Sequence, residues 1–125
     1  MTMIRTVALG LLAATALTGS ALAQDAADDK LKVGLMFTLS GPAAVLGEQG
    51  RDGFMLAVET MGGKLGGLET EITTVDDELK PDIAANKARE LVERDDADFV
   101  VGPIFSNILM AIAKPVTDGG AFLIS

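Results

Sequence analysis

The feature that most constrains the fold of this chain is a regular alternation of short apolar segments with longer amphipathic ones. Apolar and β-branched residues predict strands over 31–37, 68–75, 99–101 and 121–125. Helical spacing of apolar residues predicts helices over 43–61, over 83–94 and from Ser106 or Asn107 to Asp118. Strands joined by helices through short connections imply right-handed crossovers. We therefore expect an α/β fold with a doubly wound parallel sheet.

The two longest expected strands differ in pattern. Residues 31–37 are apolar almost throughout, as in a strand that is covered on both faces. Residues 68–75 alternate apolar and polar side chains and are rich in Thr, which places this strand nearer an edge of the sheet.

Each expected helix carries an apolar stripe that should face the sheet. The stripes are Phe54, Ala57, Val58 and Met61 in the first helix, Ala84, Ala88, Leu91 and Val92 in the second, and Ile108, Ile112 and Val116 in the third. Gly62 and Gly63 should end the first helix. Asp82 is the expected N-cap of the second helix, and Pro115 should kink or restart the third near Ala111.

The first residues have the three parts of a secretory signal peptide. Arg5 supplies a positive charge, residues 7–17 are apolar, and Ala21-Leu22-Ala23 is a small-residue cleavage motif. We expect cleavage between Ala23 and Gln24, followed by a polar leader over 24–30. An exported chain without cysteine fits a bacterial periplasm, so a periplasmic location is expected.

Charge and composition exclude several classes of function. The net charge is −8, and loss of Arg5 with the signal peptide leaves 9 − 18 = −9. Such an acidic surface argues against a nucleic-acid partner and against anionic lipid surfaces. The chain has no Cys and no His, which removes thiol nucleophiles, imidazole bases and zinc sites built from them. No Gly-rich phosphate loop is present, so we expect no cofactor and no metal.

Ligands of an open parallel sheet bind beyond the carboxyl ends of its strands. At the first such end, Ser40-Gly41-Pro42 is either an anion-binding helix start or a plain turn with a cap. At the second, the acidic residues 76–78 are better explained as a solvated loop rim than as a cation site or catalytic acids. At the third, Phe105, Ser106 and Asn107 suit a small carboxylate or polar ligand, although helix capping alone explains Ser106 and Asn107 equally well.

Several segments in this order together resemble the periplasmic binding proteins of branched-chain amino-acid ABC importers. They are LKVGLMFTLSGPAAVLGEQGRDGFMLAVE, VDDELKPD, AANKARELVERD, and DFVVGPIFSN through KPVTDGGAFLIS. The resemblance implies that residues 31–125 form the opening, incomplete part of the first lobe of a two-lobed protein. That protein would capture a small molecule and deliver it to an inner-membrane permease, and it would not be an enzyme.

The resemblance also implies ligand-binding positions. Leu46 matches a contact from the loop after the first strand, where the family commonly has an aromatic side chain, and Ser106 matches the serine after the third strand. Phe105 and Asn107 flank it. Because Leu46 is not aromatic and Phe105-Ser106-Asn107-Ile108 lacks the usual hydroxyl-rich run, amides and aromatic or aliphatic carboxylates join amino acids as candidate ligands. The alternatives are a ligand-sensing extracytoplasmic domain and an α/β hydrolase fragment, and the hydrolase would need a base for Ser106 from elsewhere.

Overall fold

A computed structural model describes residues 30–125 of the chain, so the expected signal peptide and the Ala23–Gln24 cleavage point lie outside the described residues. This part contains five strands and three helices. In chain order they are β1 (Leu31–Phe37), α1 (Ala44–Thr60), β2 (Lys64–Leu65), β3 (Leu68–Asp76), α2 (Pro81–Glu93), β4 (Phe99–Val101), α3 (Ser106–Asp118) and β5 (Phe122–Ile124).

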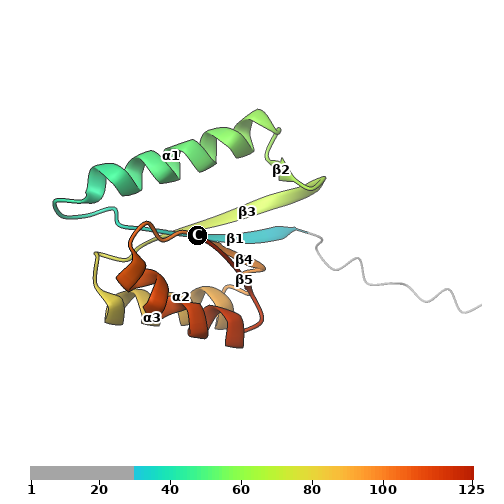
Figure 1. Ribbon diagram of the computed structural model, residues 1–125. Coiled ribbons are helices and arrows are strands. Elements are labelled where there is room, and N and C mark those ends of the chain that lie inside the picture. Colours follow the sequence, from blue (N-terminus) through green and yellow to red (C-terminus); the bar gives the residue numbers. More distant parts are fainter. Residues whose placement is uncertain (1–29) are drawn as a thin grey trace, which may run out of the picture.

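The strands form one sheet in the order β2-β3-β1-β4-β5. All neighbours are parallel except β2, which pairs antiparallel with β3. Helix α1 covers one face of the sheet, whereas α2 and α3 lie side by side on the other (Figure 1). The expected doubly wound α/β fold is therefore confirmed.

The positions of β1 and β3 agree with their sequence patterns. Strand β1 is the central strand, and its residues from Val33 to Phe37 are all buried. Strand β3 has only the two-residue β2 outside it, and none of its residues is fully buried. A continuous apolar strand thus lies between two helical layers, and an alternating one lies near the edge.

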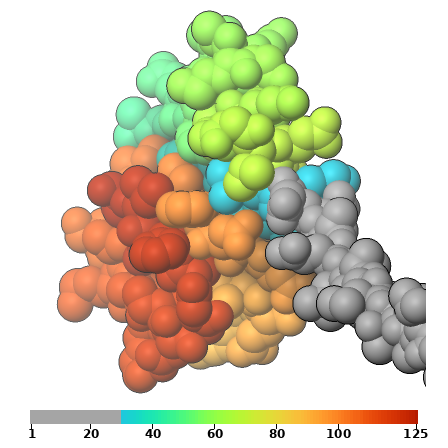
Figure 2. All heavy atoms as spheres, turned by 90° about the vertical axis from the view of Figure 1, so that its right-hand side faces the viewer, coloured from blue at the N-terminus to red at the C-terminus, as the bar shows by residue number. Residues whose placement is uncertain are grey.

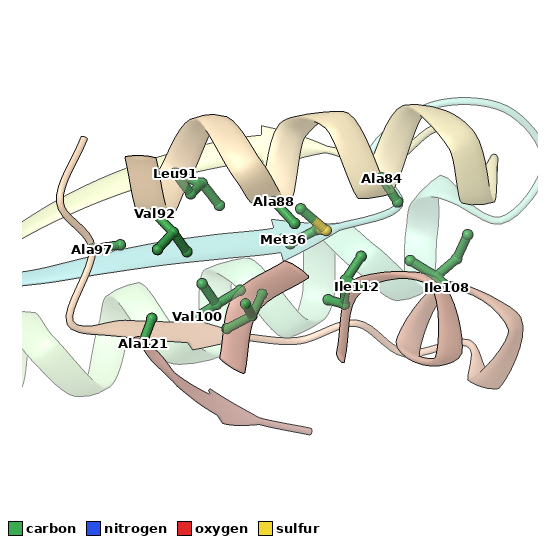
Figure 3. Packing of buried hydrophobic residues seen from close by; sticks show 11 residues of the cluster. Met36, Ala84, Ala88, Leu91, Val92, Ala97, Val100, Ile108, Ile112 and Ala121 are labelled. Atoms are coloured by element: carbon green, nitrogen blue, oxygen red, sulfur yellow. The ribbon is translucent and has the colours of Figure 1, made fainter. Parts of the chain in front are cut away.

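The larger core lies between the sheet and the pair α2 and α3, where small side chains on α2 allow α3 to approach closely (Figure 3). The stripes predicted for these helices are confirmed, because all their members are buried. Met36 of β1 and Val100 of β4 complete the floor of this core. Burial of so many aliphatic side chains at about 25 cal/mol per Å² is the main stabilising term on this face.

The stripe predicted for α1 is only partly correct. Val58 is buried and Phe54 is half-buried, but Ala57 and Met61 are exposed. The face that meets the sheet instead runs through Gly47, Phe54 and Val58, at i, i+7 and i+11. A hydrophobic pattern counts apolar side chains and therefore omits Gly47. For this reason the predicted stripe lies to one side of the face that packs on the sheet.

Both expected side-chain caps are wrong. Lys80 occupies the N-cap position of α2, Pro81 follows at the first helical position, and Asp82 lies within the first turn. Phe105 occupies the N-cap position of α3, so Ser106 and Asn107 are its first two residues and neither makes a capping hydrogen bond. The capping explanation for these two polar side chains is therefore removed.

Gly62 and Gly63 end α1 with positive φ, as expected. Two further differences concern helix α3 and strand β2. Helix α3 continues without a restart through Pro115 to Asp118. The sequence pattern did not reveal β2, which forms a hairpin with β3. Its two-residue turn, Gly66-Gly67, has positive φ at both positions, the geometry that joins antiparallel strands most tightly.

Candidate functional site

The topology of the sheet selects one point at its carboxyl edge. The chain leaves β1 toward α1 on one face and leaves the neighbouring strand β4 toward α3 on the opposite face (Figure 1). Two adjacent strands whose exits diverge in this way form a topological switch point, the place at which open α/β sheets bind ligands. The candidate site is therefore bounded by residues 38–46 and 102–107.

Residues 38–46 form one side of this switch point. Gly41 has a φ of +74°, and the Ala44 amide donates to the Gly41 carbonyl oxygen at 3.2 Å, so Ser40-Gly41-Pro42 is a turn that leads into α1. Leu46, in the first turn of α1, has an exposed fraction of 50%. The predicted contact residue Leu46 thus lies at the carboxyl edge with its side chain available to a ligand.

Residues 102–107 form the other side. Gly102 has a φ of +104°, which a side chain rarely adopts, and its amide donates to the Ile124 carbonyl oxygen at 2.9 Å. Phe105 is half-buried and packs against the core under α3. Ser106 and Asn107 are exposed, and their side chains make no hydrogen bond with any residue in the described part of the chain. A half-buried aromatic side chain is thus followed by two polar side chains without hydrogen-bond partners among the described residues.

Ser125 is an addition that the sequence pattern did not single out. It follows β5 at the same edge, and its hydroxyl donates to the Pro103 carbonyl oxygen at 3.1 Å. This bond links the end of β5 to the loop that precedes Ser106. Its position directly after an apolar strand was the only signal in the sequence.

The acidic loop after β3 is not the solvated rim that its composition predicts. Asp77 is fully buried, and Asp76 and Glu78 are half-buried. Oδ1 of Asp77 accepts hydrogen bonds from the Thr38 hydroxyl at 2.5 Å and from the Leu79 amide at 2.8 Å. The prediction failed because the carboxylates of Asp76 and Asp77 face the loop after β1, a segment that is distant in sequence.

Asp76 makes the same kind of contact. Its Oδ1 accepts from the Leu39 amide and from the Glu78 amide, both at 2.8 Å. Partial burial acts to raise the pKa of Asp76, but these hydrogen bonds, the Ser40 side chain and the charge of Lys87 together hold it below its ordinary value. The carboxylate is therefore committed to holding the loop.

The side chains beside the switch point are either apolar or polar and neutral. Leu46, Phe105, Ser106 and Asn107 are all uncharged. No group of three or more metal-ligating side chains occurs within residues 30–125. No helix in the same range is long and apolar enough to span a bilayer. Hydroxyl and amide groups beside apolar side chains can orient a small polar ligand.

Volume alone does not identify the site. Two depressions of about 250 and 370 Å³ lie at the opposite, amino end of the sheet, where Figure 2 looks onto the starts of the strands. The first is lined partly by Lys32, Arg94 and Asp95, and these three charged side chains already form ion pairs with neighbouring residues. The carboxyl edge is singled out by topology and by its free polar groups.

Comparison with known proteins decides the family. Residues 30–125 match the periplasmic binding protein family. The chain belongs to that family. Among characterised members, it is 29% identical over 97 residues to the Leu/Ile/Val-binding protein BraC3 of Rhizobium johnstonii. That match covers 76% of this chain and 26% of the relative.

Solved periplasmic binding proteins superimpose on the same segment. A solute-binding protein from R. palustris in complex with benzoate is 37% identical, with a TM-score of 0.70, and the match covers 75% of this chain and 26% of that one. The branched-chain amino acid binding protein LivJ from Streptococcus pneumoniae, in complex with isoleucine, is 29% identical, with a TM-score of 0.70 and coverages of 75% and 28%. The chain thus spans about a quarter of the length of these relatives.

Proposed function

We propose that this chain is the first part of the solute-binding component of an ABC importer, which captures an amino acid or a related small carboxylate or amide. The single observation that carries the proposal is the switch point between the exits of β1 and β4, where Ser106 and Asn107 present uncommitted polar side chains. Membership of the periplasmic binding protein family supports the same role. A permease in the inner membrane would be the partner.

Each of the four residues at the switch point has a role in this proposal. The Ser106 hydroxyl donates to the carboxylate or other polar head of the ligand, and the Asn107 amide assists. The start of α3 favours a negatively charged head, because the first amides of a helix have no partner within it. Phe105 and Leu46 line the apolar part of the pocket from opposite sides. Discrimination between ligands would then depend mainly on the shape between these two side chains.

Two observations support the proposed ligand class: the ligands of similar proteins, and the shapes of Leu46 and Phe105. The benzoate-binding relative has the higher identity, 37% against 29% for the isoleucine-binding one. An aliphatic Leu46 and an aromatic Phe105 form a pocket that accepts a flat ring or a branched chain. Benzoate, 4-hydroxybenzoate and isoleucine are therefore the ligands to test first.

Export is part of the proposal. The signal pattern at the start of the chain and the family of the remainder both favour an extracytoplasmic location. Mass spectrometry of the protein recovered from the periplasmic fraction would test this. A product that begins at Gln24 supports export and cleavage, whereas an intact amino terminus in the cytoplasmic fraction contradicts both.

Binding can be tested by ¹H–¹⁵N NMR of the exported chain titrated to millimolar concentrations of the three ligands. Amide signals of Leu46, Ser106 and Asn107 should move together and saturate, and Ser106→Ala should weaken the response. Met110→Ala, on the exposed side of the same helix, is the matched control and should leave it unchanged. Absence of any shift at this edge with all three ligands would contradict the assignment. Ester turnover that is lost in Ser106→Ala would instead favour a hydrolase.

A further inference from the structure

We propose that Asp77, together with Asp76, is a positioning residue that holds the loop after β1 in its binding geometry before a ligand arrives. This inference rests on the proposed function, because that loop leads directly to Leu46. The carboxylates of residues 76 and 77 fix residues 38–40, and through them the start of α1.

The sheet register places the two loops against each other. Phe37, the last residue of β1, is paired with Asp76, the last residue of β3. The Asp77 amide donates to the Phe37 carbonyl oxygen at 3.0 Å, so the parallel pairing extends one step beyond both strands. Thr38 and Asp77 then lie opposite each other, both fully buried.

Each of the two carboxylates accepts hydrogen bonds from both loops. Oδ1 of Asp77 accepts from the Thr38 hydroxyl, and Oδ1 of Asp76 accepts from the Leu39 amide. The same two oxygens also accept from the Leu79 and Glu78 amides, respectively. One pair of acidic residues thus binds two consecutive residues of the first loop while it fixes its own turn.

The turn that carries this pair is conformationally demanding. Glu78 and Leu79 have φ values of 52° and 56°, in the left-handed region that residues with a side chain seldom adopt. Each of their amides is held by a carboxylate two residues earlier. Without those acceptors the turn would relax to ordinary φ values, and the contacts to residues 38 and 39 would be lost with it.

Asp77 has one further property that makes the proposal testable. Its Oδ2 is buried and has no hydrogen-bond partner among residues 30–125, so all of its observed contacts are made by Oδ1. Asparagine retains that acceptor oxygen, whereas alanine removes it. On the other side of the contact, Thr38→Val removes the hydroxyl and keeps the shape, and Thr38→Ser keeps the hydroxyl.

The experiment is amide hydrogen exchange of the exported chain, four single variants and one double variant, without ligand. Relative to the Val100 amide in the core, Thr38→Val and Asp77→Ala should accelerate exchange over residues 39–46 about tenfold, the effect of one lost hydrogen bond. Asp77→Asn and Thr38→Ser should remain within about threefold of the original chain, and the Thr38→Val/Asp77→Ala pair should be non-additive. Should Asp77→Ala fail to fold, Thr38→Val carries the test alone.

Two results would overturn the proposal. One is unchanged exchange over residues 39–46 in Thr38→Val. The other is acceleration that is equal there and at Val100, which would indicate a purely global effect on stability. A titration of Thr38→Val with benzoate and isoleucine separates this inference from the proposed function. If neither compound binds the original chain, the function fails, but the exchange data still decide the role of Asp77.

Discussion

Gly47 of α1 lies so close to Thr38 that a Cβ added to the glycine would sit 1.8 Å from the Thr38 carbonyl oxygen. The obstruction is backbone and cannot rotate away, so Gly47→Ala should destabilise the fold by about 1–3 kcal/mol or more. Gly53 in the same helix has nothing within 4 Å of such a Cβ, and Gly53→Ala should stabilise by about 0.5–1 kcal/mol. Urea unfolding of both variants checks this, and equal effects would contradict it.

The core between α2 and α3 gives a second prediction. Leu91 is fully buried and packs among residues from both helices and the sheet. Leu91→Ala should lower the free energy of unfolding by about 2–5 kcal/mol, because the cavity it leaves cannot close completely. Met110, 83% exposed on α3, is the matched surface position, and Met110→Ala should change stability by less than about 0.5 kcal/mol. Thermal unfolding followed by circular dichroism separates the two outcomes.

Acid stability should depend on Asp76. The folded state holds the pKa of this carboxyl below its ordinary value near 3.8, so its contribution is fully present at neutral pH and is lost as the pH falls below about 4 through the folded value. Asp76→Asn should therefore destabilise the chain at pH 7, and that difference should be smaller at pH 3, below the ordinary pKa of the carboxyl. Asp52→Asn, an exposed carboxylate of α1, is the charge-matched control. A penalty for Asp76→Asn that is the same at both values of pH would refute the explanation.

An apolar patch on the α1 side of β4 and β5 should make the isolated chain associate. Phe122 is 69% exposed and stacks on Phe99, with ring centroids 5.3 Å apart, and the adjoining groove is lined only by apolar side chains. In Figure 2 the red spheres at the carboxyl end of the chain lie at the surface. In analytical ultracentrifugation, self-association raises the sedimentation coefficient as the protein concentration increases. Phe122→Gln should reduce this increase more than Met110→Gln does. Identical behaviour of the two variants would show that this patch is not the cause.

The order of elements and most of the core could be predicted from the sequence, because they depend on local periodicity. The stripe from Ile108 to Val116 and the buried strand 31–37 are examples, and each is visible within a few residues of chain. Family resemblance added the positions of Leu46 and Ser106, and their roles as ligand contacts remain predictions.

What could not be predicted depends on contacts between distant segments. Asp77 is acidic and follows a strand, so the composition of this loop predicts an exposed side chain. The register of β1 with β3 instead places Asp77 opposite Thr38, where it is buried. Gly47 has no side chain, so the hydrophobic pattern could not assign it to the packed face of α1. The N-cap of α2 lies two residues before Asp82 and that of α3 one residue before Ser106. Local preferences do not resolve helix starts to one or two residues.

The central place of β1 also affects when the sheet can form. Leu31 pairs with Thr70 and Val33 with Phe99, so the first strand to be synthesised finds its partners only 39 and 66 residues later. Pairing of such distant segments is slow, because a long loop must close before any contact forms. This order of synthesis delays completion of the sheet until most of the polypeptide has been made. The same register that builds the sheet thus leaves β1 without its partner strands for most of synthesis.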